Sequence, residues 1–337
     1  MTRNSKLEPR ADVFGSSVAA RHRDRYRVLG GVLAFASDHP DLARLVHAAF
    51  AGLPGRRGAG STPRLRVRLK LTADSQPPWI GEPPPMRYFS GAGFVGGAMD
   101  ASNLALVHPA AGEALVCISP RLLRDAYYAR YELLEFAVYT LATQALELAP
   151  LHAACVGLGR RGVLIVGSSG AGKSTFALQA AMSGLAFLSE DSTLVAPRPL
   201  DATGLAACVH VRDDSLRFVA SAALRRQIRE SPVIRRRSGV AKYEVDLRVG
   251  AFRMAPAPLS IGALVFLSRR TARPGALLKP ITSGQAIERL TREQLYAARQ
   301  PTWGALTKNL RGVPAFELRR GRHPDEAVAA VRALLDG

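Results

Sequence analysis

The sequence predicts an α/β protein with a smaller α+β domain in front of the main domain, on two observations. In the second half of the chain, strand-like and helix-like segments are mixed, and the apolar run Val163–Val166 leads through a glycine-rich loop into the helix-like segment Lys173–Ser183. Before residue 150 the pattern differs, because paired apolar runs precede one long segment of helical spacing. We therefore expect a mobile segment at 1–27, an accessory α+β domain at 28–149 and the α/β domain at 150–337.

Local patterns predict the elements of the accessory domain. Ser37–Pro40 carries capping residues and a proline suited to the first turn of a short helix. Thr62–Leu71 alternates apolar and basic side chains, which predicts a half-buried strand with a basic outer face. Leu104–Val107 and Ala114–Ile118 predict a β-hairpin, and Ser119 to about Leu148 predicts one long helix.

Short apolar runs beyond residue 150 predict further strands, and two amphipathic segments predict helices. The expected strands are His152–Val156, Ala186–Leu188, Cys208–Arg212, Tyr243–Leu247, Leu259–Leu267 and Pro314–Leu318, and the expected helices are Ser283–Leu290 and Pro324–Leu335.

The composition is that of a globular protein in a reducing compartment. Hydrophobic residues make up 47% of the 337 residues, and no apolar run is long enough for a membrane span, so we expect a cytoplasmic protein without a membrane partner. The three cysteines have no metal-ligand spacing. The net charge of +19 has two readings, a polyanionic partner or the compositional drift of an Arg-rich chain. The clusters Arg64–Lys70 and Arg225–Arg237 are candidate sites for an acidic partner.

One motif predicts the chemistry. The segment Gly167–Ser174 matches G-x-x-x-x-G-K-[ST] at each fixed position, between an apolar strand and a helix. Glycines permit positive φ angles, so that successive N–H groups can surround phosphate oxygens at the positive end of a helix. Lys173 can reach the β- and γ-phosphates, and the Ser174 hydroxyl can coordinate Mg²⁺. The expected nucleotide-binding residues are Gly167, Ser168, Ser169, Gly170, Ala171, Gly172, Lys173, Ser174 and Thr175.

Two flanking features suggest a reaction of the bound nucleotide. Glu190 and Asp191 end the next expected strand, where one carboxylate could hold Mg²⁺ and the other could accept a proton from an incoming hydroxyl. An ordinary acidic turn is the alternative. His152 begins the strand before the motif, either as a core residue or close to the reacting phosphate. Lys242 and Arg248 are either cations for the γ-phosphate or surface charges.

Together these segments resemble the catalytic domain of HPr kinase/phosphorylase, and in particular its divergent relatives associated with lasso-peptide biosynthesis. The resemblance covers Pro150–Pro197 and implies the β-rich P-loop fold shared with phosphoenolpyruvate carboxykinase. It also implies that Ser174 and Asp191 hold Mg²⁺, that Glu190 stands at the general-base position, where the family has Asp, and that His152 lies near the transferred phosphate. The Glu-x-Arg-Gly element of true HPr kinases has its nearest counterpart at Asp213–Arg217.

The resulting hypothesis is a kinase that uses ATP and Mg²⁺ to phosphorylate a serine-type hydroxyl on a peptide or small protein, with Glu190, Lys173 and His152 as catalytic residues. A kinase for a metabolite such as free serine and a regulatory nucleotide-binding protein are the alternatives. A nucleic-acid partner is not expected, because no helicase signature accompanies the motif. The accessory domain is expected to dock the acceptor or to form a homo-oligomer.

Overall fold

A computed structural model describes residues 20–55, 64–74, 79–256, 258–272 and 277–337. The chain forms two compact units, of which the first contains Leu33–Ala49 and Arg64–Ala145, and the second consists mainly of Leu146–Gly337. The second unit therefore begins a few residues before the expected boundary at residue 150. Within the described ranges, no helix has both the length and the apolar character needed to cross a bilayer.

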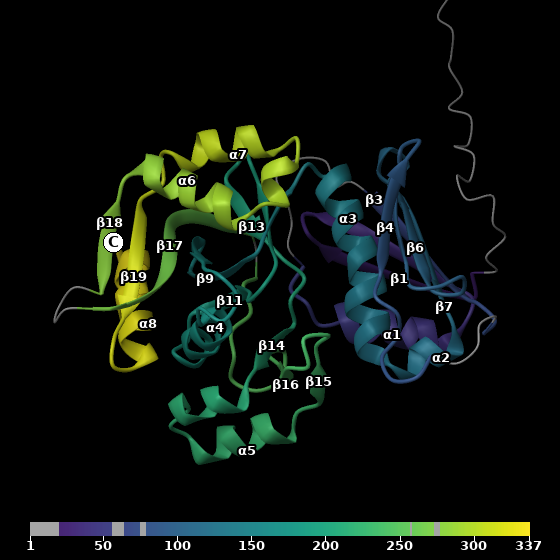
Figure 1. Ribbon diagram of the computed structural model, residues 1–337, viewed down its shortest axis with the longest axis horizontal. Helices are drawn as coiled ribbons and strands as arrows, with labels where there is room; N and C mark the ends of the chain where they lie inside the picture. The colour runs from purple at the N-terminus through teal and green to yellow at the C-terminus, as the bar shows by residue number, and fades with distance from the viewer. Residues whose placement is uncertain (1–19, 56–63, 75–78, 257, 273–276) are drawn as a thin grey trace, which may run out of the picture. The chain divides into compact units, whose positions relative to one another are not determined.

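The first unit contains most of a seven-stranded sheet with the strand order β1-β2-β3-β7-β6-β5-β4. Helix α3 packs against β3, β6 and β7 (Figure 1). The bounds are β1 His22–Val28, β2 Gly31–Ser37, α1 Pro40–Phe50, β3 Arg64–Leu71, β4 Arg87–Gly91, β5 Phe94–Ala98, β6 Leu104–His108, η1 Pro109–Ala111, β7 Glu113–Ile118, α2 Pro120–Arg124, η2 Tyr128–Leu134 and α3 Glu135–Ala145.

Helix α1, strand β3 and the β6–β7 hairpin lie where the sequence patterns predict them. Strand β3 alternates as expected, with Leu65, Val67 and Leu69 buried, and its Arg66 and Arg68 form ion pairs with Glu113 of β7. Thr62 and Pro63 of the expected strand lie outside the described residues.

Two expectations for this unit need correction. Most of the segment expected to be mobile, 1–27, lies outside the described residues, but its last part forms strand β1 from His22. The single long helix expected from Ser119 is divided into α2, a π-helical turn and α3, because α2 ends at Asp125 in a non-helical conformation (φ −98°, ψ 64°).

A nine-stranded mixed sheet forms the centre of the second unit, in the order β11-β9-β10-β17-β13-β12-β8, and β19 and β18 continue it beside β17. Strand β17 runs parallel to β10 and β19, whereas β9 runs antiparallel to both of its neighbours, β10 and β11. The bounds are β8 Ala149–Leu151, β9 Ala153–Leu158, β10 Arg161–Val166, α4 Lys173–Met182, β11 Ala186–Ser189, β12 Thr193–Ala196, β13 Asp201–Thr203, β17 Leu259–Thr271, β18 Leu278–Ile281, α6 Ser283–Glu293, η4 Ala297–Arg299, α7 Trp303–Leu310, β19 Ala315–Arg320 and α8 Pro324–Asp336.

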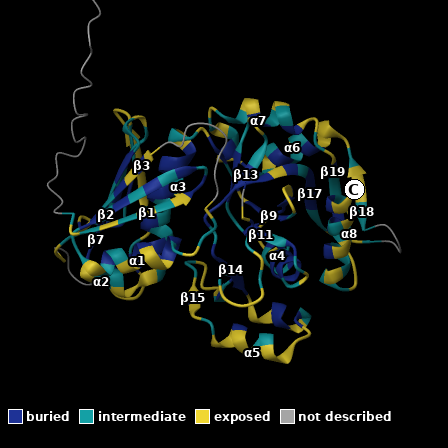
Figure 2. Ribbon diagram, turned by 180° about the vertical axis from the view of Figure 1, so that it is seen from behind, coloured by how far each residue is buried: buried dark blue, intermediate teal, exposed yellow. Residues whose placement is uncertain are grey.

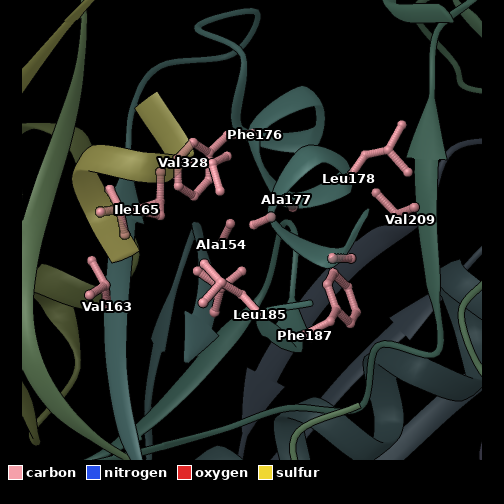
Figure 3. Packing of buried hydrophobic residues seen from close by; sticks show 14 of the residues in the cluster. Ala154, Val163, Ile165, Phe176, Ala177, Leu178, Leu185, Phe187, Val209 and Val328 are labelled. Carbon is pink, nitrogen blue, oxygen red and sulfur yellow. The ribbon is translucent and has the colours of Figure 1, made fainter. Parts of the chain in front are cut away.

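Helices cover both faces of this sheet, so that its central strands are buried on both sides. Val163 and Ile165 of β10 pack with α4 and α8, and Figure 3 shows Phe176 and Val328 of these helices beside Ile165. Leu164 and Val166 face the opposite layer, which contains α6 and α7 (Figure 1). Burying an aliphatic side chain of this size contributes about 1.5–3 kcal/mol, which fixes the end of β10 where the glycine-rich loop begins.

A smaller three-stranded sheet, β14-β16-β15, lies between β13 and β17 in the sequence. Its elements are β14 Cys208–Val211, η3 Asp213–Phe218, α5 Ala222–Glu230, β15 Val233–Arg235 and β16 Ala241–Asp246. Ile228 anchors α5 to the core, whereas the other side chains of this helix are exposed or partly exposed (Figure 2). The sequence patterns did not indicate α5 or β15.

Candidate functional site

The glycine-rich loop connects β10 to α4 as the motif predicts. Strand β10 ends at Val166, and α4 begins at Lys173, directly after Gly172. Gly172 is the N-cap and provides no side-chain acceptor, so within the described residues no side-chain hydrogen bond caps the first N–H groups of α4. Uncapped N–H groups at the positive end of a helix are suited to bind an anion.

The structure gives two different reasons for glycine at the three fixed or left-handed positions of the loop. Gly170 (φ +75°) and Gly172 (φ +106°) adopt left-handed backbone conformations, which favour glycine. Gly167 does not adopt a positive φ. Packing is tight at this position, because a Cβ atom there would lie 3.1 Å from the Ala171 Cβ and 3.2 Å from the Leu267 Cβ.

Lys173 takes part in a hydrogen-bonded chain across the site. Its Nζ lies 2.6 Å from the carbonyl oxygen of Gly167 and 2.9 Å from His152 Nε2. His152 Nδ1 in turn lies 3.1 Å from Asp191 Oδ1. Because an ammonium group only donates, His152 accepts at Nε2 and carries its proton on Nδ1, where it donates to Asp191. The structure thus brings three of the predicted site residues together.

This arrangement shifts the pKa of each member. Burial, and then the neighbouring Lys173, lower the pKa of His152 despite the opposing Asp191, so the imidazole is held neutral. Burial also lowers the pKa of the Lys173 ammonium. Burial alone would raise the pKa of Asp191, but His152, Arg236 and Lys173 outweigh it and hold the pKa below the usual value. Asp191 is therefore ionised at neutral pH.

Gln294 fixes the backbone position of His152, a role that the sequence did not reveal. Its side-chain oxygen accepts a hydrogen bond from the His152 N–H at 2.7 Å, and its amide nitrogen donates to the His152 carbonyl at 3.1 Å. His152 lies in a bend between β8 and β9, instead of beginning a strand as expected, and Gln294 is buried beside it. The imidazole is thereby held at the cavity wall.

Glu190 is not at the expected position. Only 2% of Glu190 is exposed, and its Oε1 accepts hydrogen bonds from the His210 backbone N–H at 3.0 Å and from His210 Nδ1 at 2.5 Å. Asp191, one residue later, is partly exposed and lines the cavity, whereas Glu190 does not. The expectation that the Glu190 side chain points into the site therefore needs correction, because Asp191 lines the cavity and Glu190 is buried against His210.

A cavity of about 480 Å³ lies over the glycine-rich loop. The predicted residues Ser169–Thr175, His152 and Asp191 line it, and Thr175 also shares a 3.1 Å hydrogen bond with Ser215. Gly167 and Ser168 lie in the loop but outside this wall. Basic side chains surround the cavity, which favours an anionic ligand: Arg212, Arg217, Arg236, Lys242, Arg319, Arg320 and Arg322.

The two remaining basic candidates differ in position. Lys242 lines the cavity, where burial and the neighbouring Arg236 lower the pKa of its ammonium group. Arg248 is instead held by Asp246, with Nη2 at 2.6 Å from Oδ2, and is not part of the wall. The segment Asp213–Arg217, the nearest counterpart of the Glu-x-Arg-Gly element, also lines the cavity, through Asp214, Ser215 and Arg217.

The oxygen donors at the cavity are of the kind that Mg²⁺ prefers. Ser174 contributes a hydroxyl and Asp191 an ionised carboxylate, and phosphate oxygens of a bound nucleotide would complete such a coordination shell. Among the described residues, no group of three or more His, Cys, Asp or Glu side chains forms a preassembled metal site. The fit of Mg²⁺ therefore depends on a nucleotide.

Comparisons with known proteins give a likeness in structure but not in sequence family. Neither the protein-family models nor the curated proteins contain a match to this chain. Among solved structures, the HPr(Ser) kinase/phosphatase from Coxiella burnetii matches with a TM-score of 0.25 and 13% sequence identity. The match covers 55% of this chain and 94% of that one.

Proposed function

We propose that this protein is an ATP- and Mg²⁺-dependent kinase that transfers the γ-phosphate to a serine-type hydroxyl of a peptide or small protein. The observation that carries the proposal is the position of Lys173. Its ammonium group stands between the carbonyl of the glycine-rich loop and the His152–Asp191 pair, at a cavity lined with basic side chains.

The phosphates would bind over the loop. Gly170 and Gly172 give the loop its left-handed turns, and the uncapped N-terminal N–H groups of α4 would donate to phosphate oxygens. Lys173 would exchange its contact with the neutral His152 for a phosphate oxygen, which is a stronger acceptor because it is charged. This exchange frees His152 Nε2 at the moment the nucleotide binds.

The transfer step uses these contacts. The acceptor oxygen attacks the γ-phosphorus, the bond between this phosphorus and the β,γ-bridging oxygen breaks, and ADP leaves with the bridging oxygen. The proton of the acceptor hydroxyl goes to His152 Nε2, and Asp191, which accepts the hydrogen bond from Nδ1, stabilises the resulting imidazolium. Lys173 and the loop amides stabilise the charge on the phosphates. Ser174 and Asp191 would hold Mg²⁺, which would neutralise charge on the phosphates.

Two other functions remain as candidates. A metabolite kinase, for example for free serine, would use the same phosphate-binding residues and differ only in the acceptor. A regulatory protein that binds the nucleotide without transferring phosphate is favoured by one specific observation, the burial of Glu190 against His210. Glu190 would then be unavailable to an acceptor, although Asp191 and Asp214 line the cavity.

A transfer assay distinguishes these functions. The full chain is incubated with Mg²⁺ and ATP labelled at the γ-phosphate, and the acceptors are short serine-containing peptides and free serine. Label on a peptide supports the proposal, and label on serine alone supports the metabolite kinase. Saturable ATP binding without transfer to any acceptor would support the regulatory function and refute the kinase.

A further inference from the structure

Among the described residues, no strand pairs with the outer edge of β15, and this edge leads to the cavity. The order β14-β16-β15 makes Val233–Arg235 the last strand of its sheet. Glu244 N–H donates to the Pro232 carbonyl at 2.8 Å and Arg236 N–H to the Val240 carbonyl at 3.0 Å. In an antiparallel ladder hydrogen-bonded pairs alternate, so Ile234 pairs with Lys242 and the main-chain groups of Val233 and Arg235 point away from β16.

The side chains along this edge follow a pattern that suits an extended ligand. Val233 is 62% exposed, Arg235 is exposed on the same face, and Ile234 between them is buried. Large apolar side chains are seldom so exposed on an edge strand, because an exposed apolar edge favours pairing with another strand. The edge therefore combines an apolar position, a basic position and outward-pointing N–H and C=O groups.

The edge leads directly to the proposed active site. Directly after β15, the chain turns through Arg236, Ser238 and Val240 and returns along β16 to Lys242, and these four residues line the cavity. Strand β18 is another edge, in the nine-stranded sheet, but none of its residues lines the cavity. An extended chain paired with β15 would thus reach the cavity within a few residues, at about 3.3 Å per residue.

The charge of this part of the chain indicates the chemistry of the ligand. Residues 208–253 contain eleven Arg and Lys against five Asp and Glu. Arg235, Arg236 and Arg237 follow one another at the end of the edge that is nearest to the cavity. Because the edge is short, main-chain hydrogen bonds alone would give a weak complex, and an acidic ligand would gain from these cations.

We infer that an extended acidic peptide, which carries the acceptor hydroxyl, docks as a fourth strand against β15. This inference rests on the proposed kinase function and specifies its acceptor. An apolar peptide side chain lies opposite Val233, and an acidic one lies opposite Arg235, two residues nearer to the hydroxyl. The expected sequence of the acceptor peptide is therefore Ser-x-Glu-x-Val if it runs antiparallel to β15 and Val-x-Glu-x-Ser if it runs parallel.

The test compares two variants at one position. Val233→Pro removes an outward N–H group without breaking a β15–β16 hydrogen bond, and Val233→Thr keeps both the N–H group and the branched side chain. Fluorescein-labelled peptides with the two motifs are titrated with the full-length variants, and binding is followed by anisotropy. We expect Val233→Pro to bind the preferred peptide about tenfold more weakly than Val233→Thr, with ATP binding equal in both.

A second measurement does not depend on the proline. Replacing Glu in the peptide by Gln weakens binding to the wild-type protein, and we expect this loss to disappear in Arg235→Gln if the two side chains are paired. Equal peptide binding by Val233→Pro and Val233→Thr would overturn the inference. It would also be overturned if the change from Glu to Gln in the peptide weakened binding to Arg235→Gln as much as binding to the wild-type protein.

Failure of the two proposals can be told apart. If peptides bind in the expected order but no phosphate is transferred, the kinase is refuted and the β15 site stands. If phosphate is transferred to the peptides equally well by both Val233 variants, the kinase stands and the β15 site is refuted.

Discussion

Glu190 and Asp191 are adjacent carboxylates, and the structure predicts opposite consequences for their isosteric amide substitutions. Asp191 contacts His152 at the cavity, so Asp191→Asn removes the charge that orients and stabilises the imidazole. Loss of a group that assists proton transfer costs about a hundredfold to ten-thousandfold in rate. Folding should change little, because the Asp191 side chain is 40% exposed.

Glu190→Gln should instead act mainly on stability. The Glu190 side chain is only 3% exposed, and its Oε1 accepts both hydrogen bonds from His210. Gln offers a neutral acceptor, so charge assistance is lost in a buried place where solvent does not replace it. A hydrogen bond to a charged group contributes about 1.5–3 kcal/mol, and we expect the free energy of unfolding to fall by about 2 kcal/mol.

Two measurements on each variant separate these effects. Thermal unfolding should show a melting temperature lower by about 4–8 °C for Glu190→Gln and nearly unchanged for Asp191→Asn. Phosphate transfer, measured well below both melting temperatures, should be lost in Asp191→Asn and largely kept in Glu190→Gln. Transfer abolished in Glu190→Gln, at an unchanged melting temperature and with intact ATP binding, would refute this reasoning and return the role of base to Glu190.

Four further predictions concern the same unit. Lys173→Met should lower transfer roughly a thousandfold while the protein stays folded, as measured by initial rates and circular dichroism, and near-normal transfer would exclude the proposed role. Gly172 has a φ of +106°, so Gly172→Ala should lower the free energy of unfolding in denaturant by about 1–2 kcal/mol and weaken ATP binding. The control is Gly304→Ala in helix α7, where the added methyl group has open space around it, and this variant should not weaken ATP binding. The pKa of His152 is lowered from 6.5 in the folded protein, so below about pH 6.5 the unfolded chain binds more protons and the free energy of unfolding falls with decreasing pH. His152→Gln should flatten this pH dependence in urea titrations. An unaltered pH dependence would contradict the prediction. Phe187→Ala should cost about 3–5 kcal/mol, because Phe187 is fully buried, and a loss below about 1 kcal/mol would show that the core refills the space.

The sequence alone located the glycine-rich loop and the elements on either side of it. Val163–Val166 is apolar on both faces of a short strand, and the glycines and Lys173 come directly after it, so the prediction needed only local information. The alternation in β3 and the starts of α1, α6 and α8 were predicted for the same reason, because periodicity and capping residues act over a few neighbouring positions.

Tertiary structure decided which of the two adjacent carboxylates meets the cavity. Strand β11 shifts register against β9 between Phe187 and Ser189, and such a bulge changes the face to which the next side chains point. The sequence contains no signal for this shift, since it arises from the pairing of the two strands. Tertiary structure likewise brought Gln294 to His152, 142 residues away, and placed the edge of β15 beside the cavity. These contacts join segments that are distant in the chain, whereas the glycine-rich loop is made by consecutive residues.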